Sequence, residues 1–520
     1  MLGKLLQNNA RNEWKGRRMA QQMVGLTGFG GYIPRLRLQR KSIVQANAWV
    51  APNFLGKGKG ERSMANWDED CVTMAVEAAR DLLGPDDDRS HVDALYFGST
   101  TMPFKDRLNS GIISAALTLD ERVRAIDVAS TQRAGTSALM QALSAVRGGE
   151  VKSALVLASD HRKTKAVTAQ ELDFGDGAAA LSVGTDNVIA AYLGGASLTL
   201  DFVDHFRGDT EEFDYNWEER WIRDEGFAKI VPRAVKAALE NSSVSAEEIK
   251  HFVLPCPFGD KFVQQLAKRS GIAPEAARDT LAANCGETGV AHSLVMLVHT
   301  LQTEAKPGDK VLLLHFGGGC DALVFEVTDK LSSQASKRGI TGSLRNRMEE
   351  TNYMKFLTFN GLIEWERGMR AEQDKKTALT TLYRNEDMLM GLVGGRCTET
   401  GVVQFPRSRI SVNPNKHTVD TQEPYKFAEK KAKILSWSAD FLSFSMNPPN
   451  HYGMVVFEEG GRIMMDFTDV EIGAVDSGME VKLVFRIKEI DEKRGFRRYF
   501  WKAVPVAASE AKSQTGQAAE

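Results

Sequence analysis

Two loops of the sequence carry residue types suited to carbonyl or acid–base chemistry. Gln132 stands in the run VASTQRAGTSAL, and its side-chain amide can donate a hydrogen bond to a carbonyl oxygen. Glu287 stands in ANCGETGVAHSL, where a buried carboxylate with a raised pKa would act as a general base. Each also has a structural interpretation: Gln132 can satisfy backbone groups at a helix start, and Glu287 can cap a turn or pair with an arginine.

Cysteine forms covalent acyl intermediates, and the chain has five of them. Cys256 and Cys285 are the candidates for a nucleophile, although free buried cysteines are usually small core residues. His292, in the apolar run after Glu287, is expected to be a core histidine. The odd number and scattered spacing of the cysteines argue against a disulfide framework and favour a reducing, cytoplasmic location.

Helix and strand patterns alternate over residues 23–330 and must position these loops. After Asn66, which can cap a helix, apolar residues recur at helical spacing until Gly84 and Pro85 stop the pattern. The strand-like DALYFG follows. This helix–turn–strand unit recurs as RAVKAALENSSVSAEEIKHFVLPCP, and TSALMQALSAVRGGEVKSALVLASD is echoed by HSLVMLVHTLQTEAKPGDKVLLLHFGG. Two copies of one module predict a duplicated, layered α/β domain with buried parallel strands.

The pattern changes after Ser332. Residues 331–380 form a charged, helical connector, in which 350–372 is expected to be one amphipathic helix. Over residues 415–506, short alternating strands and the Glu459-Gly460-Gly461 turn predict the hairpins of a small all-β barrel.

Bulk properties exclude some functions. A formal net charge of -2 over 520 residues gives no electrostatic reason to expect nucleic acid or an anionic membrane as a partner. No apolar run reaches the length of a membrane span. Residues 1–22 are interpreted as a polar leader without the apolar core of a secretory signal, and residues 507–520 as a disordered tail.

Five stretches, in chain order, resemble the condensing enzymes of the thiolase superfamily, above all 3-hydroxy-3-methylglutaryl-CoA synthases and ketoacyl synthase III enzymes. VASTQRAGTSAL is similar to their nucleophile elbow, LVLASDHR with FGDGAAALSVG to their Gly-Asp-Gly segment, FVLPCPFGDKFVQQ to their histidine loop, ANCGETGVAHSL to their asparagine loop, and LLLHFGGGCDALVFEV to their glycine-rich closing segment. The resemblance spans residues 23–330 and implies a thiolase-like fold.

The catalytic positions of that family are changed. Gln132 stands where the family has its acyl-accepting Cys, Pro255 where it has His, and Glu287 where it has Asn. The Glu that assists the hydroxymethylglutaryl-CoA synthases would fall near Thr101. Because a glutamine amide cannot form a thioester, covalent acyl transfer is excluded at this position. Chain-initiating decarboxylating ketosynthases also carry Gln there, but they need histidine where this chain has Pro255.

The resemblance implies a coenzyme A thioester as ligand or substrate, with no tightly bound cofactor. Gln132 would donate to the thioester carbonyl, and Glu287, on a loop facing the elbow in this fold, would be the base of an aldol or retro-aldol step. Lys261 lies where family members place a lysine near the coenzyme A phosphates. The glycine-rich segment adds three expected ligand contacts, at Gly317, Gly318 and Gly319.

Residues 381–414 resemble the zinc ribbon that precedes an OB fold in an acyl-CoA-associated family. Of the four ligand positions only Cys397 is kept, while the others are Thr400, Ile410 and Asn413. Because a structural zinc site needs about four donors, we predict no metal. The run YGMVVFEEGGRI … GMEVKLVF resembles the OB part of the same family.

Two functions remain open on sequence alone. One is acyl-CoA chemistry that forms or cleaves a C–C bond without a cysteine of its own, in a complex with a thiolase subunit. The other is a non-catalytic scaffold that binds coenzyme A thioesters and supports a thiolase. In both, a homodimer through the thiolase-like domain is expected from the resemblance. The acyl group, the reaction direction and the pathway stay open.

Overall fold

The computed structural model describes residues 23–85, 88–335 and 337–506, so the predicted leader and tail lie outside the described residues. Nine strands of the N-terminal domain form one sheet in the order β11-β12-β13-β8-β1-β7-β6-β4-β5. Their bounds are β1 Gly25–Tyr32, β4 Ala94–Gly98, β5 Arg124–Val128, β6 Ala154–Asp160, β7 Gly177–Gly184, β8 Ala190–Thr199, β11 Ile249–Val253, β12 Lys310–Phe316 and β13 Gly319–Val327.

The two halves of this sheet repeat one topology. In the first half β4 pairs parallel with β6, and β6 pairs antiparallel with β7. In the second half β11 pairs parallel with β12, and β12 pairs antiparallel with β13. The halves meet where β1 and β8 share the pairs Gly25↔Ala191 and Leu26↔Ala190. The duplication predicted from the repeated helix–strand units is therefore confirmed.

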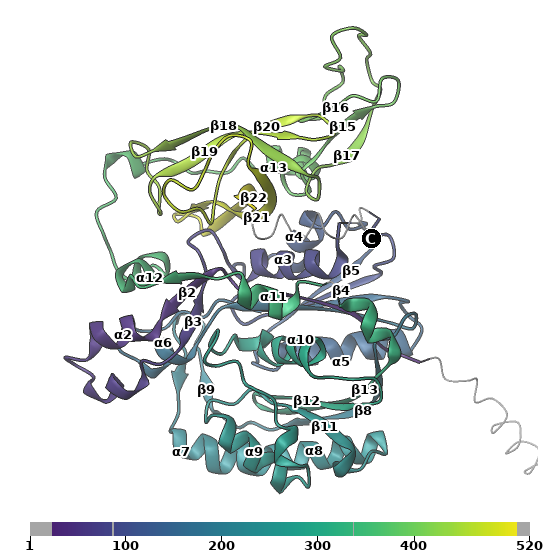
Figure 1. Cartoon of the computed structure of the whole chain (residues 1–520), viewed down its shortest axis with the longest axis vertical. Helices are drawn as coiled ribbons and strands as arrows, with labels where there is room; N and C mark the ends of the chain where they lie inside the picture. Colours follow the sequence, from purple (N-terminus) through teal and green to yellow (C-terminus); the bar gives the residue numbers. More distant parts are fainter. Residues whose placement is uncertain (1–22, 86–87, 336, 507–520) are drawn as a thin grey trace, which may run out of the picture.

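Helices separate and cover the two halves in layers (Figure 1). α5 and α10 pack against each other between the halves, α3 covers β1 and β7, and α8 covers β8 and β13. The helices of these layers are α3 Cys71–Leu83, α4 Asn109–Ala116, α5 Ala134–Arg147, α7 Glu219–Trp221, α8 Ala228–Ser242, α9 Asp260–Arg269 and α10 His292–Thr303. Within the described residues, no helix combines the length and apolar character needed to cross a bilayer.

Helix α3 begins later than the sequence suggested. Its cap is Asp70, whose side chain accepts from the backbone N–H groups of Val72 and Thr73, both at 3.0 Å. Thr73 completes a capping box by accepting from the Asp70 N–H. Asn66 instead starts the preceding turn, since the Glu69 N–H donates to its carbonyl. The predicted end is confirmed: the helix stops at Leu83, before Gly84 with φ 75°.

The single helix expected over residues 350–372 is wrong. α12 covers only Tyr353–Phe359 and ends before Gly361, whose φ of 65° breaks the helical path. The neighbouring β14, Met348–Glu350, pairs with β2 of a small three-stranded sheet. Further elements outside the nine-stranded sheet and its layers are β2 Leu36–Gln39, β3 Glu61–Met64, α2 Arg40–Asn47, α6 Ala169–Asp173, α11 Gly339–Arg345, α13 Leu379–Arg384 and α14 Glu386–Leu389.

The C-terminal part contains two antiparallel sheets. β15 Val393–Cys397, β16 Val403–Gln404 and β17 Gln422–Lys426 form the ribbon-like sheet. The larger sheet has the order β20-β19-β18-β21-β22, with β18 Ala432–Asp440, β19 Asn450–Phe457, β20 Arg462–Asp466, β21 Glu480–Asp491 and β22 Phe496–Pro505. A bridge between Phe467 and Ala503 joins its two ends, as the predicted barrel requires.

The barrel packs on the outer helical layer of the N-terminal domain, above α3 and α4 in Figure 1. One apolar core runs from α3 into the barrel, where Phe427, Phe485 and Trp501 are buried. The Trp501 indole N–H donates to the Met390 carbonyl at 2.6 Å. The barrel is thus positioned by extensive apolar contact and reaches the face of the domain where the predicted site loops lie.

Candidate functional site

A cavity of about 970 Å³ opens where the carboxyl ends of β4 and β6 meet the loop that precedes α5. In layered α/β folds this edge is the usual place for a ligand. Its walls come from Asp70 and from four stretches of the N-terminal domain: residues 99–102 with 104 and 105, residues 129–133, His161 with Lys163, and residues 201–209 with 211, 212 and 214; Gly317 and Gly318 lie beside them. Arg497, on β22 of the barrel, completes the wall.

Gln132 lies in this cavity, at the turn that opens α5. It is buried, with 8% of its surface exposed, and belongs to the lining. Ser130, two residues earlier, has a φ of 69°, which makes the turn sharp. The N-terminal end of α5 carries the partial positive charge of the helix dipole, so its neighbourhood favours a developing oxyanion. The structure therefore places the predicted residue Gln132 in the lining of a large cavity, beside the N-terminal end of a helix.

Gly317 meets Gln132 from the turn between β12 and β13, and Gly318 lines the cavity beside it. The Thr131 hydroxyl donates to the Gly317 carbonyl at 3.1 Å. A Cβ on Gly317 would stand 3.1 Å from the Gln132 Cβ, so this glycine permits a close approach of the two loops. Gly319, the third predicted contact, instead lies in β13, opposite Thr199 of β8.

Glu287 forms an ion pair, and the expected rise in its pKa is wrong. Burial alone would raise the pKa of this carboxyl, but the Arg162 guanidinium, which donates to it, holds the pKa below its usual value. Arg162 also stacks over the Phe174 ring, at 3.6 Å from the centroid. Glu287 is not among the residues that line the cavity. The arrangement matches the structural interpretation, a carboxylate paired with an arginine.

Lys261 and the two candidate cysteines also lie outside the cavity lining. Lys261 is exposed on the first turn of α9. Burial raises the pKa of the Cys256 and Cys285 thiols to about 12 in each case. At neutral pH both are protonated, which makes them poor nucleophiles.

Sequence reasoning did not single out His161, which follows β6 and lines the cavity. Its Nδ1 lies 3.0 Å from Oδ1 of Asp176. A second pair, His205 with Asp204 at 2.9 Å, lines the same cavity. His161 stands in the quoted run LVLASDHR, but no spacing within the sequence links it to Asp176.

The candidate zinc ribbon does not supply a set of metal donors. The Cys397 sulfur lies 3.2 Å from the hydroxyls of Thr418 and Thr421, and hydrogen bonds from Thr400 and these two threonines lower the pKa of the thiol to about 6. Among the described residues, no group of three or more His, Cys, Asp or Glu side chains is placed to hold a metal ion. The residues present do not fit zinc, and the absence of a metal stays a prediction.

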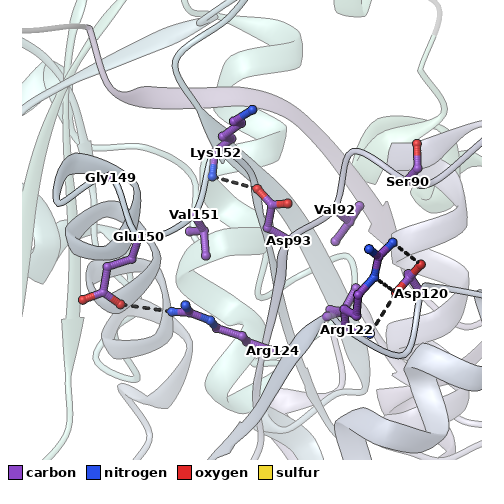
Figure 2. A pocket seen from close by; sticks show the side chains of 11 residues that line it. Ser90, Val92, Asp93, Asp120, Arg122, Arg124, Gly149, Glu150, Val151 and Lys152 are labelled. Atoms are coloured by element: carbon purple, nitrogen blue, oxygen red, sulfur yellow. Dashed lines mark hydrogen bonds and ion pairs between the residues drawn. The ribbon is translucent and has the colours of Figure 1, made fainter.

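A second pocket, of about 460 Å³, lies at the opposite ends of β4 and β6 (Figure 2). Four of its charged side chains pair with one another: Arg122 with Asp120 at 2.7 Å, and Arg124 with Glu150 at 3.1 Å. None of the predicted site residues lines it. The larger cavity at Gln132 is therefore the candidate site.

Comparison with known proteins supports the resemblance in both parts of the chain. Residues 239–326 match the family of 3-oxoacyl-[acyl-carrier-protein] synthase III C-terminal domains, and residues 425–486 match the ChsH2 C-terminal OB-fold domain. Hydroxymethylglutaryl-CoA synthase from Methanosphaera stadtmanae is 27% identical over 66% of this chain and 99% of its own length. The enzyme of the same name from Methanopyrus kandleri is 27% identical over 64% of this chain and 95% of its own length.

Solved structures agree on the fold. MvaS in complex with 3-hydroxy-3-methylglutaryl coenzyme A aligns with a TM-score of 0.56 and 20% identity, over 65% of this chain and 91% of its own. An HMG-CoA synthase complexed with CoA aligns with a TM-score of 0.56 and 16% identity, over 78% of this chain and 100% of its own. A variant of OleA from Xanthomonas campestris aligns with a TM-score of 0.51 and 20% identity, over 59% of this chain and 97% of its own.

The chain therefore has a thiolase-like α/β fold followed by an OB-fold domain, as the sequence predicted. Its N-terminal two-thirds is similar in sequence to hydroxymethylglutaryl-CoA synthases, and it is a condensing-enzyme-like protein.

Proposed function

We propose that this protein binds an acyl-CoA and takes part in forming or cleaving a C–C bond without a covalent acyl-enzyme. The observation that carries this proposal is the position of Gln132, which occupies the elbow of a large cavity in which none of the lining residues is a cysteine. In this proposal a helix N-terminus and the Gln132 amide polarise the carbonyl, and no cysteine attacks it.

Coenzyme A is the proposed ligand because two solved neighbours carry it, one as coenzyme A and one as 3-hydroxy-3-methylglutaryl coenzyme A. In this proposal the Gln132 amide donates to the thioester carbonyl oxygen, and the N-terminal end of α5 favours the charge that develops there. Gly317 and Gly318 leave room for the thioester beside Gln132. Lys261 and Gly319 stay proposed contacts for the outer part of coenzyme A.

Glu287, first predicted to be a general base, is proposed here to position Arg162 instead. As an ionised partner of Arg162, it is a weak proton acceptor at neutral pH. It would act by fixing Arg162, whose Nη1 lies 3.8 Å from Asp214, a residue of the cavity wall.

The second candidate function is a non-catalytic subunit that supports a thiolase in a complex. The joint replacement of three catalytic positions, at Gln132, Pro255 and Glu287, favours it. A homodimer is part of both proposals. The exposed edge strand β5, with Ile126 45% exposed, supports pairing with a second copy because an uncovered sheet edge has unpaired backbone groups.

Calorimetry with acetyl-CoA and with free coenzyme A tests binding. The expected result is saturable binding that weakens in Gln132→Ala only for the thioester, because only the thioester has the carbonyl. Failure to bind either compound would overturn both candidate functions.

Assays of the chain alone, and with a thiolase that co-purifies with it, separate the two functions. Turnover of an acyl-CoA by the isolated chain would rule out the non-catalytic scaffold function. Loss of that turnover in Glu287→Gln, with binding and melting temperature unchanged, would restore the predicted base.

A further inference from the structure

We propose that His161 is the acid–base residue of this cavity and that Asp176 orients it; this inference rests on the proposed function. The pair is formed by Nδ1 of His161 and Oδ1 of Asp176, at 3.0 Å. His161 lines the cavity with 18% of its side chain exposed, whereas the Asp176 side chain is only 2% exposed. Because Nδ1 is engaged with Asp176, Nε2 is the ring nitrogen available to a bound molecule.

The backbone of His161 is fixed by a network at the ends of β4 and β6. Its N–H donates to the Thr101 hydroxyl at 3.0 Å. Thr101 in turn donates to the buried Asp160 carboxylate at 3.0 Å, and the Val290 N–H donates to the same carboxylate at 2.9 Å. A base must be held within reach of one proton, and this network supplies that rigidity.

Asp176 is held as a carboxylate. The Ala65 N–H donates to its Oδ2 at 2.8 Å, which leaves Oδ1 for the imidazole. Burial would raise the pKa of this carboxyl, but His161 and the nearby Arg62 lower it below the ordinary value. A buried, ionised carboxylate selects the tautomer with the proton on Nδ1 and stabilises the imidazolium when Nε2 accepts a second proton.

The other histidines near the site are less suited to this role. His292 uses both ring nitrogens, accepting from the Thr288 N–H at 3.1 Å and donating to the Thr280 carbonyl at 2.8 Å. Burial lowers the pKa of His315 to about 4. Burial also opposes protonation of His205, but Asp204 outweighs it and raises the pKa, so the ring tends to carry its proton already.

The proposed step is proton transfer at the carbon next to the thioester carbonyl. Nε2 of His161 accepts the proton, the C–H electron pair moves into the C–C bond, and the carbonyl π pair moves onto oxygen. The resulting enolate oxygen is stabilised by the Gln132 amide. Return of the proton from His161 reverses the step, so no oxidant or second substrate is needed. Charged groups of both signs line the cavity around the ring, among them Asp70, Lys105, Lys163, Arg207, Asp214 and Arg497, with further acidic side chains from residues 201–212.

Deuterium exchange tests the step directly. Acetyl-CoA and propionyl-CoA are incubated with the full chain in D₂O, and α-deuteration is followed by mass spectrometry. The expected result is exchange that His161→Asn slows by about 100-fold or more, the usual contribution of a general base. Imidazole added to His161→Ala restores part of the rate, which a structural defect would not permit. Asp176→Asn slows exchange and moves the pH profile.

The matched control is His251→Asn. His251 also pairs with an aspartate, Asp309, at 3.0 Å, but it lies on β11 and does not line the cavity. Exchange should stay within about twofold of the unchanged chain. Unaltered exchange in His161→Asn would overturn the inference. Binding of both thioesters without any exchange would also overturn it, but would leave the proposed binding function intact. Absence of binding would instead overturn the proposed function itself.

Discussion

Nζ of Lys502 lies 2.8 Å from Oδ2 of Asp68, and the two side chains are 2% and 0% exposed. The pair joins β22 of the barrel to the turn before α3. Its neighbours repeat the pattern, since Glu69 pairs with Arg486 and Asp70 with Arg497. Three consecutive acidic residues therefore each form an ion pair with a different basic residue of the barrel. Because Arg497 also lines the cavity, this contact fixes the barrel as part of the candidate site.

Lys502→Met should lower stability strongly, because it leaves the Asp68 carboxylate buried without its cation. Removing one partner of a buried pair costs about 3–5 kcal/mol. The double variant with Asp68→Leu should recover most of this loss, since no charge is then left unpaired. Melting curves measure the effect. Lys229→Met, which removes the exposed pair with Glu225, is the control and should cost below about 1 kcal/mol. Equal losses at both sites would contradict the role of the buried pair.

The same pair predicts acid sensitivity. Burial would raise the pKa of Asp68, but Lys502 and Arg486 lower it below the ordinary value. A carboxyl whose folded pKa is depressed contributes stability above its unfolded pKa, about 3.9, and loses that contribution as pH falls through the folded pKa. The melting temperature should therefore stay level near neutral pH and fall below about pH 4. The Asp68→Leu/Lys502→Met variant should show a shallower acid loss. An identical acid profile for the two proteins would refute this assignment.

The sequence predicted the helices and strands better than it predicted which charged side chains pair with one another. Each apolar helix–strand unit is about 25 residues long, so local spacing was enough to indicate the duplicated sheet and the loop that carries Gln132. The pKa of Glu287 depends on Arg162, which is 125 residues away, and Asp68 is 434 residues from Lys502. Such pairings follow from tertiary packing and leave no periodic signal. His161 was missed for the same reason: its importance depends on a cavity assembled from distant loops.

Gly317→Val should weaken binding of acetyl-CoA by roughly tenfold or more, about 1.4 kcal/mol. The new side chain would start 3.1 Å from the Gln132 Cβ and 3.3 Å from the Arg133 nitrogen, so the elbow at Gln132 must shift by a few tenths of an ångström and the added methyl groups would crowd it. Calorimetry measures the change. Gly56→Val is the control, because a Cβ at Gly56 meets no atom within 4 Å. Undiminished affinity in Gly317→Val would show that the thioester does not bind beside Gln132.

Ile126→Lys should separate the proposed homodimer into monomers. Strand β5 is an edge of the nine-stranded sheet, and Ile126 is 45% exposed, so strand pairing with a second copy would bury it. A lysine there would place two like charges at the centre of a symmetric contact and cost several kcal/mol. Sedimentation analysis of the full chain should show the mass halved. Ile410→Lys is the control, since Ile410 is 59% exposed but lies away from the sheet, so its mass should not change. A dimer that survives Ile126→Lys would exclude β5 as its interface.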